Sequence, residues 1–406
     1  MKRIKIVFIH YGGALGGAPI SLASLAGGLD RNRYEPVVIL TDHGPAMEFF
    51  KRTNVPCRIE PMRSGLFLGA STKIGIRSLS RFVFNYQKTL DVMHRVIETE
   101  KPDIVHLNTS VLLPHARIVN SFSIPLIWHV REMLQDGILG RMLVNEINKR
   151  ASYVITTTNT VRDIFPDKRN VITIYNAVDL NYFHPLIARQ NGSRIRNELG
   201  INKNRFVVAI VGHVTRAKGH YVFLEAAHHA VKINPNILFM VIGGGDLPAH
   251  YTRSWKGHIK RMINMPMNND EDLQQKVHKY GLDKHFMFLP FRYDMPEMLG
   301  AVDLIVFPSV KAEGFGRPLM EAMATARPVV ATAIGPTAEL LQDGNTGWLV
   351  PPDDPHALSE AICNCTERSE EELALIGQKQ RKRAEEIFDL NKQVVCIQQL
   401  YDDVLS

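Results

Sequence analysis

The stretch that decides the fold is DLIVFPSVKAEGFGRPLMEAMA, residues 303–324. It begins with a short apolar run, continues through a loop with two glycines, and ends in helix-forming residues behind a proline. A proline is tolerated in the first turn of a helix, because an N–H group there has no partner within the helix. The order strand, glycine loop, helix is the repeating unit of parallel α/β sheets, so this segment predicts that class of fold.

The same order recurs along the whole chain. Short, continuous apolar runs predict strands that helices cover on both faces. In the first half these runs are IKIVFIH, EPVVIL, DIVHL, PLIWHV and YVITT, and in the second half RFVVAIVG, ILFMVIGG, HFMFLP, DLIVFPS, RPVVAT and GWLVP. Helical stretches such as SLASLAGGL and QKTLDVMHRVIETE separate them. Two successive sets predict an α/β protein with two Rossmann-like, doubly wound parallel-sheet domains.

The length of the chain, 406 residues, fits two domains of ordinary size. The weakest patterning lies at residues 180–204, a polar stretch that contains a proline and a glycine, and it predicts the linker. We therefore expect a first domain over residues 1–185 and a second over 186–385. Residues 386–406 are expected to form a C-terminal helix that can pack back on the first domain.

The composition is that of a soluble globular protein, with 45% hydrophobic and 22% charged residues. No run approaches the roughly 20 apolar residues that a membrane span needs. The start MKRIKIVFIH has basic residues before an apolar run, but the run is too short for a signal peptide and predicts a first strand. The four cysteines form no C-x-x-C pair, which indicates reduced thiols in a cytoplasmic protein without a zinc site.

The net charge of +7 is unevenly distributed. Residues 1–185 contain 23 Lys and Arg against 15 Asp and Glu, whereas the remainder contains 25 against 26. This imbalance favours an anionic partner or surface for the first half. Lys73, Arg77 and Arg81 recur every four residues near Phe and Leu, a helical stripe that can lie on an anionic membrane. A solvated helix face is the alternative.

The first loop that can carry chemistry is HYGGALGGA, residues 10–18, between the first strand and a helix expected from about Pro19. Its glycines let backbone amides approach a ligand, and the start of a helix favours an anion. A tight turn without a ligand explains it equally well. The spacing is not the G-x-G-x-x-G of dinucleotide-binding proteins, which disfavours a dehydrogenase.

Two further loops follow strands of the second half. In GHVTRAKG, residues 212–219, Arg216 and Lys218 flank the start of a helix, where both can neutralise a diphosphate. Two solvated charges in a surface loop are the alternative. In EGFGRPLME, residues 313–321, backbone amides and the positive helix end can face an anion, and Glu321, one turn into the helix, can accept hydrogen bonds from sugar hydroxyls.

These segments resemble retaining glycosyltransferases of family 4. The similarity includes EGFGRPLME with the following AMATARPVV, and GNTGWLVP at residues 344–351. It continues through GHVTRAKG, VIGGGD and FLPFRYDMPEML in the second half, and the glycine loop, WHVRE and YNAVD in the first. The resemblance implies a GT-B fold, in which two Rossmann-like domains face each other across a cleft that holds the active site.

The resemblance also implies roles for single residues. Arg216 and Lys218 would hold the donor diphosphate, and Glu321 the ribose hydroxyls. Glu313 would lie against the transferred sugar, and His129 would contact that sugar. For His129, a structural histidine at the end of a strand is the alternative. The donor-binding residues would be Gly16, Gly17, Arg216, Lys218, Gly244, Phe315, Gly316 and Glu321, and the catalytic residues His129, Glu313, Arg216 and Lys218. On the acceptor side would lie Arg131 and Glu132, for which a local ion pair is the alternative.

Two departures from the family pattern affect neighbouring contacts. His213 and Val214 stand where Arg and Leu are frequent, and the sequence between Gly245 and Gly281 is longer than the usual connection. The longer connection predicts an insertion with several basic residues, namely Arg253, Lys256, Lys260 and Arg261.

The function that the resemblance implies is transfer of a sugar from a nucleotide-diphosphate sugar, with a UDP-sugar favoured, to a glycan or lipid-linked acceptor with retention. No cofactor and no metal are expected, since Arg216, Lys218 and a helix dipole can stabilise charge on the leaving phosphate. A peripheral position on the membrane fits the basic first half. The alternatives are an epimerase or phosphorylase of the same fold, and a non-catalytic glycan-binding subunit.

Overall fold

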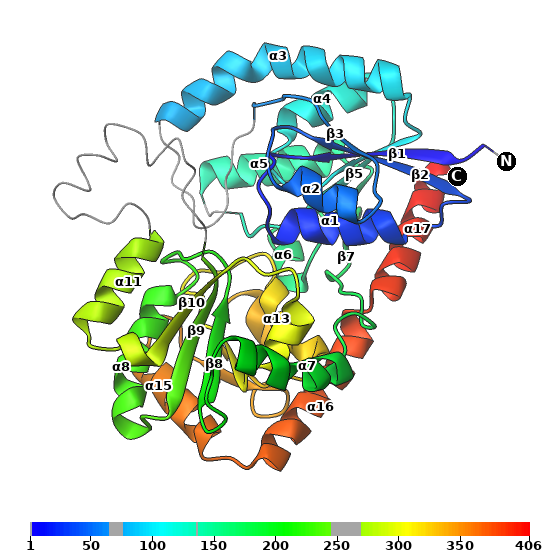
Figure 1. Ribbon diagram of the computed structural model, residues 1–406. Helices are drawn as coiled ribbons and strands as arrows, with labels where there is room; N and C mark the ends of the chain where they lie inside the picture. The colour runs from blue at the N-terminus through cyan, green and yellow to red at the C-terminus, as the bar shows by residue number, and fades with distance from the viewer. Residues whose placement is uncertain (1, 65–75, 135–136, 245–268) are drawn as a thin grey trace. The chain divides into compact units, whose positions relative to one another are not determined.

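The computed structural model describes residues 2–64, 76–134, 137–244 and 269–406 (Figure 1). These residues form two compact units. Unit 1 consists of Met1–Asp179, Ala312–Phe315 and Ile387–Ser406, and unit 2 of Leu180–Lys311 and Gly316–Glu386. The insertion is predicted between Gly245 and Gly281, and residues 245–268 of this stretch, with its four basic residues, lie outside the described residues, as does the stripe position Lys73.

Unit 1 is built on a seven-stranded parallel sheet in the order β3-β2-β1-β4-β5-β6-β7. Its strands are β1 (Ile4–His10), β2 (Tyr34–Leu40), β3 (Cys57–Ile59), β4 (Ile104–Leu107), β5 (Leu126–Val130), β6 (Tyr153–Thr156) and β7 (Val171–Thr173). Its helices are α1 (Gly17–Gly28), α2 (Ala46–Arg52), α3 (Ile76–Glu100), α4 (Leu113–Ser121), α5 (Ile138–Arg150), α6 (Asn159–Arg162) and α17 (Leu390–Leu405).

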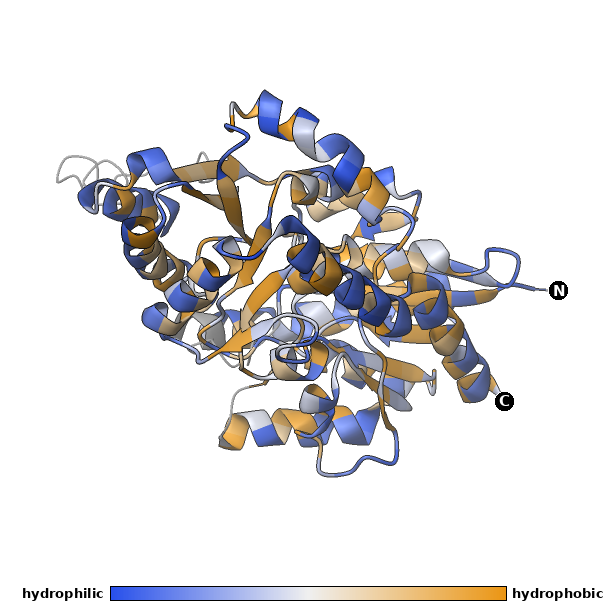
Figure 2. Cartoon of the chain, turned by 90° about the horizontal axis from the view of Figure 1, so that it is seen from below, coloured by the Kyte–Doolittle hydropathy of each residue, from blue (hydrophilic) through white to orange (hydrophobic). Residues whose placement is uncertain are grey.

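Both faces of this sheet are covered, as the continuous apolar runs predict. Val7 and Ile9 of β1 pack with residues of α3, α4 and α5, whereas Ile6 and Phe8 pack with residues of α1, α2 and α17. Successive strand residues point to opposite faces, so an apolar residue at every position indicates a sheet that is buried on both sides. Figure 2 shows the strands in the hydrophobic colour while the helices carry both colours.

Helix α17 completes the core of unit 1, although it comes from the end of the chain. The Tyr401 hydroxyl lies 2.7 Å from Nδ1 of His106 on β4, and the Tyr34 hydroxyl donates to Asp402 at 2.8 Å. Burial, and then the charge of Arg131, lower the pKa of His106 to about 3, so this imidazole stays neutral at physiological pH.

Unit 2 is built on a six-stranded parallel sheet in the order β10-β9-β8-β11-β12-β13. Its strands are β8 (Phe206–Val211), β9 (Ile237–Gly244), β10 (Phe286–Pro290), β11 (Leu304–Phe307), β12 (Val329–Thr332) and β13 (Trp348–Val350). Its helices are α7 (Pro185–Glu198), α8 (His220–Ile233), α11 (Asn269–Lys279), the short η1 (Asp283–His285), α12 (Met295–Gly300), α13 (Arg317–Ala324), α14 (Pro336–Leu340), α15 (Pro355–Thr366) and α16 (Glu370–Ile387).

The linker predicted at residues 180–204 is wrong, because most of this stretch is helix α7. The buried residues of α7 are Ala188, Gly192 and Ile195, which have helical spacing, but two of them are too small to stand out in a hydrophobicity pattern. Their size has a structural reason: a Cβ atom on Gly192 would overlap the carbonyl of Gly300 in α12. The two helices therefore approach closely along a face without large side chains.

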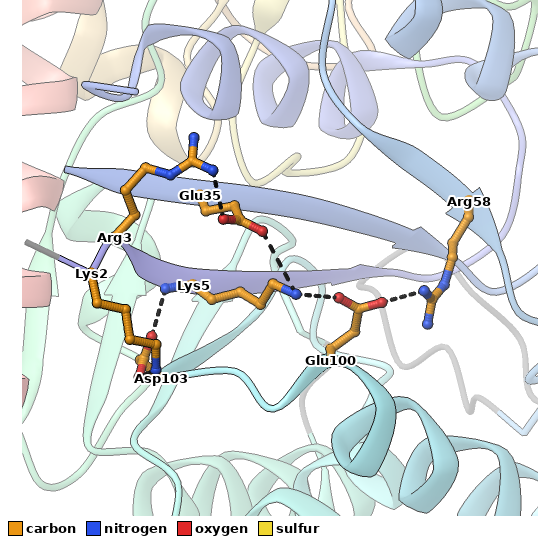
Figure 3. A network of polar contacts seen from close by, with 7 residues as sticks. All are labelled: Lys2, Arg3, Lys5, Glu35, Arg58, Glu100 and Asp103. Carbon is orange, nitrogen blue, oxygen red and sulfur yellow. Dashed lines mark hydrogen bonds and ion pairs between the residues drawn. The ribbon is translucent and has the colours of Figure 1, made fainter. Parts of the chain in front are cut away.

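A polar network at the amino-terminal ends of β1 and β2 fixes the end of α3 to the sheet (Figure 3). At its centre, the buried Glu100 carboxylate accepts hydrogen bonds from Lys5 at 2.9 Å and from Arg58. Lys5 also lies 3.7 Å from Glu35, which pairs with Arg3. Burial raises the pKa of Glu100, but the bonds and charges of Lys5 and Arg58 outweigh it, so the pKa lies below its usual value.

We expect Glu100→Gln to lower the free energy of unfolding at pH 7 by about 1–3 kcal/mol, since two cations lose their charged partner. A depressed carboxyl pKa adds stability above the unfolded-state pKa of about 4.3, and that stability is lost as the pH falls through the folded-state pKa. The difference from wild type, measured by urea unfolding, should therefore shrink between pH 5 and pH 3. The control is Glu48→Gln, whose exposed carboxylate lies 3.9 Å from Lys51. A pH-independent loss for Glu100→Gln would contradict this account.

Candidate functional site

The carboxyl ends of the parallel strands of unit 1 meet at one edge of the sheet, where ligands bind in folds of this class. Polar side chains occupy this edge, among them His10 at the end of β1, Asn108 just after β4 and Arg131 just after β5. All three side chains are buried. A polar group that is buried without a hydrogen-bond partner destabilises the fold. The partners of these three side chains therefore show how this edge is organised.

Arg131 connects four segments of unit 1, one of them through Asn108. Its Nε atom donates to Oδ1 of Asn108 at 2.7 Å, and its Nη1 atom donates to Oδ1 of Asn176, which lies in the predicted YNAVD segment. Asn108 Nδ2 in turn lies 3.0 Å from Nδ1 of His10. The guanidinium thus ties the ends of β1, β4 and β5 to the segment that follows β7, and it holds a positive charge inside the edge of the sheet.

His129, the predicted contact to the donor sugar, lies on β5 and is fully buried. Burial, and then the charges of Arg131 and His106, hold its pKa well below 6.5, so the imidazole is neutral. Arg131 Nη2 lies 3.4 Å from its Nδ1, and since a guanidinium can only donate, the proton belongs on Nε2. Nε2 has no hydrogen-bond partner among the described residues. His129 therefore holds a buried N–H donor that no described residue uses.

The carboxylate of Glu132 is held by two backbone amides. Its Oε2 atom accepts hydrogen bonds from the amides of Ser110 and Arg131, each at 3.2 Å. Burial raises its pKa, and those amides and the Arg131 charge partly offset this. The carboxylate is fixed at the start of the segment after β5, beside the buried cation.

Residues 313–315 of the EGFGRPLME motif, with Ala312 before them, belong to unit 1. The carbonyl oxygen of Gly314 accepts a hydrogen bond from Thr157 Oγ1 at 2.8 Å, and a Cβ atom on Gly314 would overlap the carbonyl of Arg131. Phe315 is nearly buried, with its ring edge-on to Phe388 at 5.6 Å. The structure thus brings the neighbours of Glu313 against the segment that carries Arg131, which the sequence places far away.

The glycines of the first loop divide into two roles. Gly12 donates its N–H to Thr41 Oγ1 at 2.7 Å, and a Cβ atom on Gly13 would overlap the backbone of His43, so these two serve packing against the loop after β2. Helix α1 begins at Gly17, two residues earlier than predicted, with Gly16 as its N-cap and no side-chain cap. The first amides of α1 have no side-chain cap and can therefore bind an anion.

In unit 2, the loop after β8 places both predicted cations directly before α8. Lys218 N–H donates to Thr215 Oγ1 at 3.2 Å, and the following Gly219 has φ +77 and lies against the carbonyl of Pro308, after β11. Only glycine fits this position, which closes the loop into the start of α8. The guanidinium of Arg216 stacks on the Tyr221 ring at 4.4 Å. Positive side chains and a positive helix end therefore coincide at this loop.

Glu321, the predicted ribose contact, lies in α13 and is buried. Burial raises its pKa, and the Arg317 charge partly offsets this. Arg317 Nε lies 2.7 Å from Glu321 Oε1, which makes the two side chains an i,i+4 ion pair. This pair was not predicted, although residues four apart on a helix are neighbours on its surface. Helix α13 begins at Arg317, so Pro318 lies in its first turn, as predicted. Gly316 is the N-cap, and a Cβ atom built on it would lie 2.9 Å from the Phe307 ring.

Sequence reasoning also passed over one D-x-D triplet, Asp270-Glu271-Asp272. The triplet forms the first turn of α11, where carboxylates favour the helix dipole. Asp272 accepts a hydrogen bond from the Tyr221 hydroxyl at 2.6 Å and so supports the ring on which Arg216 stacks. In the part of the chain that the structure describes, no three His, Cys, Asp or Glu side chains are placed to hold a metal ion.

A hollow of about 680 Å³ lies elsewhere, around the amino-terminal ends of β6 and β7. It is lined by amides and charged groups such as Asn148, Lys149, Arg169 and Asn170. Because ligands of open parallel sheets bind at the carboxyl ends of the strands, we assign the chemistry to the polar edge around Arg131 and to the loops of unit 2.

Two family models of glycosyltransferases match successive parts of the chain. The model described as Glycosyltransferase Family 4 matches residues 15–182, and the model described as Glycosyl transferases group 1 matches residues 192–383. One relative is the UDP-Gal:alpha-D-GlcNAc-diphosphoundecaprenol alpha-1,3-galactosyltransferase of Escherichia coli, 25% identical over 78% of this chain and 80% of that protein. Another is the O-antigen chain mannosyltransferase C of Escherichia coli, 26% identical over 84% and 82% of the two chains.

Solved structures match over nearly the whole length. Anabaena Alr3699/HepE in complex with UDP and glucose superposes with a TM-score of 0.78 at 24% identity, covering 99% of this chain and 100% of that one. A glycosyltransferase from Rickettsia africae gives a TM-score of 0.78 at 18% identity, covering 100% of both chains. At these identities the likeness concerns the fold, and it confirms the two Rossmann-like parallel-sheet domains predicted from the sequence.

Proposed function

Since glycosyltransferase models match residues 15–182 and 192–383, the chain is a glycosyltransferase similar to those of family 4, and we propose that its donor is a UDP-sugar and its acceptor a glycan or lipid-linked glycan. We further propose that transfer retains the anomeric configuration and needs no metal ion. The observation that carries the proposal is the loop after β8, where Arg216 and Lys218 lie directly before the start of α8.

The proposed role of this loop follows from the chemistry of the leaving group. Breaking the bond between a sugar and a nucleoside diphosphate builds negative charge on the departing phosphate. The cations Arg216 and Lys218 and the positive end of α8 can stabilise that charge at the moment it forms. In this proposal Gly244 and the backbone of Phe315 and Gly316 also approach the donor, and Glu321, fixed by Arg317, accepts hydrogen bonds from the ribose.

Unit 1 contributes groups of a different kind. The first amides of α1, at Gly16 and Gly17, can bind a phosphate oxygen, and the Nε2–H group of His129 can donate to a sugar hydroxyl. In this proposal Glu313 lies against the transferred sugar, and Arg131 and Glu132 shape the acceptor side. Retention would follow from attack on the face from which the phosphate departs.

The choice of donor and acceptor has support in the relatives. One is named for a UDP-Gal donor and a diphosphoundecaprenol-linked acceptor, and one similar structure was solved with UDP and glucose. The basic balance of residues 1–185 fits an acceptor that is anionic or lies on an anionic membrane. None of the helices described in the structure is long and apolar enough to cross a membrane.

A thermal-shift panel tests the proposed donor. The chain is heated with UDP, GDP, ADP or NAD, and a ligand present at 100 times its Kd should stabilise the fold by about 2.7 kcal/mol. We expect UDP to raise the melting temperature most. Stabilisation by NAD alone would contradict the proposal, and UDP-sugar binding without transfer to any acceptor would favour the non-catalytic alternative. Release of a changed nucleotide sugar would indicate an epimerase, and sugar phosphate formation a phosphorylase.

We expect transfer to continue in excess EDTA at the rate measured without it. The reason is that Arg216, Lys218 and a helix end supply the positive charge that a divalent cation supplies in metal-dependent enzymes. The measurement is UDP release with and without EDTA, followed by addition of Mg²⁺ or Mn²⁺. Loss of activity that either ion restores would contradict a metal-free site and would direct attention to the triplet at the start of α11.

A further inference from the structure

Large apolar side chains are exposed at one end of two helices in unit 1. On α3, Val83 and Phe84 are 62% and 85% exposed. On α5, Ile138, Leu139 and Met142 are 70%, 50% and 58% exposed. Single exposed apolar residues are ordinary, but five on two helices that cover the same face of the sheet indicate an interaction surface.

The exposed apolar residues of α5 do not pack in the hydrophobic core. They occupy positions one, two and five of the helix, which is one face of its first turns. The core face of α5 is a separate stripe, formed by Leu143, Val144 and Ile147. Helix α5 thus has apolar residues on two sides at its start and ordinary polar residues towards its end.

The two helices lie on the same face of the sheet. Helix α4 contacts both α3 and α5, and Figure 1 shows the three in succession. We call their exposed part the α3–α5 surface, which comprises Val83 and Phe84 of α3 and Ile138, Leu139 and Met142 of α5, with the basic residues described next.

The charges of the α3–α5 surface have one sign. Its exposed basic side chains are Arg81 and Lys88 on α3, Arg117 on α4 and Arg141 on α5. The sequence has no Asp or Glu from residue 61 to 90, in α4, or in α5 before Glu146. Arg81 belongs to the stripe predicted from the sequence and is exposed, while the side chains of Lys73 and Arg77 lie outside the described part.

We propose that the α3–α5 surface docks the enzyme on an anionic lipid bilayer. Ile138, Leu139 and Met142 enter the boundary between headgroups and acyl chains, and the surrounding arginines contact lipid phosphates. Apolar groups flanked by basic residues, without acidic ones, are the chemistry of interfacial membrane binding. A protein partner would have to match the same apolar stripe with an acidic rim, whereas an anionic bilayer offers both features everywhere. The proposal rests on the proposed function in one respect: the docked enzyme would reach a lipid-linked acceptor.

Co-sedimentation of the full chain with vesicles tests docking without any substrate. One set of vesicles contains phosphatidylglycerol and phosphatidylcholine, and the other phosphatidylcholine alone. The first variant is Ile138→Ser/Leu139→Ser/Met142→Ser, and the second is Arg81→Glu/Arg141→Glu. The matched control is Leu186→Ser/Ile233→Ser/Leu375→Ser in unit 2, whose side chains are 57%, 65% and 55% exposed.

We expect wild type and the control to bind anionic vesicles, with binding weakened by salt because exposed charges are screened. Each of the two α3–α5 variants should lower the partition coefficient at least tenfold, an order-of-magnitude expectation for three apolar side chains or two reversed charges. The melting temperature and the UDP-induced shift of each variant are measured alongside. A retained UDP shift with lost vesicle binding supports the proposal, and failure of the UDP shift in wild type concerns the proposed function alone.

Equal binding of wild type to both vesicle types, or unchanged binding by both variants, would overturn the proposal. Sedimentation velocity without lipid provides a further check. A wild-type dimer that the apolar variant dissociates would identify the surface as a contact between copies of the chain, and would also overturn it.

Discussion

Lys218→Ala is expected to lower kcat/KM for the nucleotide sugar by roughly 10- to 150-fold, and Arg216→Ala by a similar factor. This range corresponds to the loss of a charge-assisted hydrogen bond of about 1.5–3 kcal/mol to the donor diphosphate. Both residues lie in the loop directly before α8, where the positive helix end adds to their charge. The measurement is initial rates of UDP release over a range of donor concentrations.

Two control variants distinguish the loss of a phosphate-binding charge from a general effect of the substitution. Lys279→Ala removes an exposed lysine of α11 and should leave kcat/KM unchanged. Arg216→Lys keeps the charge but loses the planar group that stacks on Tyr221, so an intermediate effect is expected. Unchanged UDP affinity in both alanine variants, with melting temperatures like wild type, would remove the donor diphosphate from this loop.

Gly314→Ala is expected to reduce kcat by about a hundredfold or more, an order of magnitude known for misplacement of reacting groups. The added Cβ would overlap the carbonyl of Arg131, and because the obstacle is backbone, the loop of residues 312–315 has to move. Its displacement would carry Glu313 and Phe315 away from the edge that holds His129. UDP affinity should fall far less, since Arg216 and Lys218 are untouched.

The matched control for this variant is Gly281→Ala. Gly281 has φ +68 and open space around a Cβ, so alanine there costs about 1 kcal/mol of backbone strain without a clash. We expect a lower melting temperature and unchanged kcat for Gly281→Ala, whereas kcat falls in Gly314→Ala. Wild-type kcat in Gly314→Ala would show that the position of this loop does not matter for transfer.

The strands and the loops that follow them could be predicted because parallel sheets buried on both faces leave continuous apolar runs. The loop of Arg216 and Lys218 lies before a helix as predicted, since its strand and helix are both strongly patterned. Helix α7 was mistaken for a linker because its pattern is weak rather than strong. Its core face is made of Ala188, Gly192 and Ile195, and a face of small residues gives a weak hydrophobic signal.

The partners of the site residues were harder to predict. Arg131 binds Asn108 and Asn176, and the pairing depends on which strands are neighbours in the sheet, which no local pattern reveals. The packing of Gly314 against Arg131 is of the same kind. The pair of Arg317 and Glu321 is different, because its i,i+4 spacing within a helix is visible in the sequence.

Calorimetric titration of UDP into wild type and into the double variant Arg216→Ala/Lys218→Ala tests the central claim most directly. The claim is that unit 2 holds the diphosphate of the donor through these two cations. It predicts saturable binding of one UDP per chain to wild type, unchanged by EDTA, and binding weakened at least a hundredfold in the double variant with its melting temperature preserved. Equal binding of UDP by the two proteins, or no binding of any nucleoside diphosphate by wild type, would contradict it.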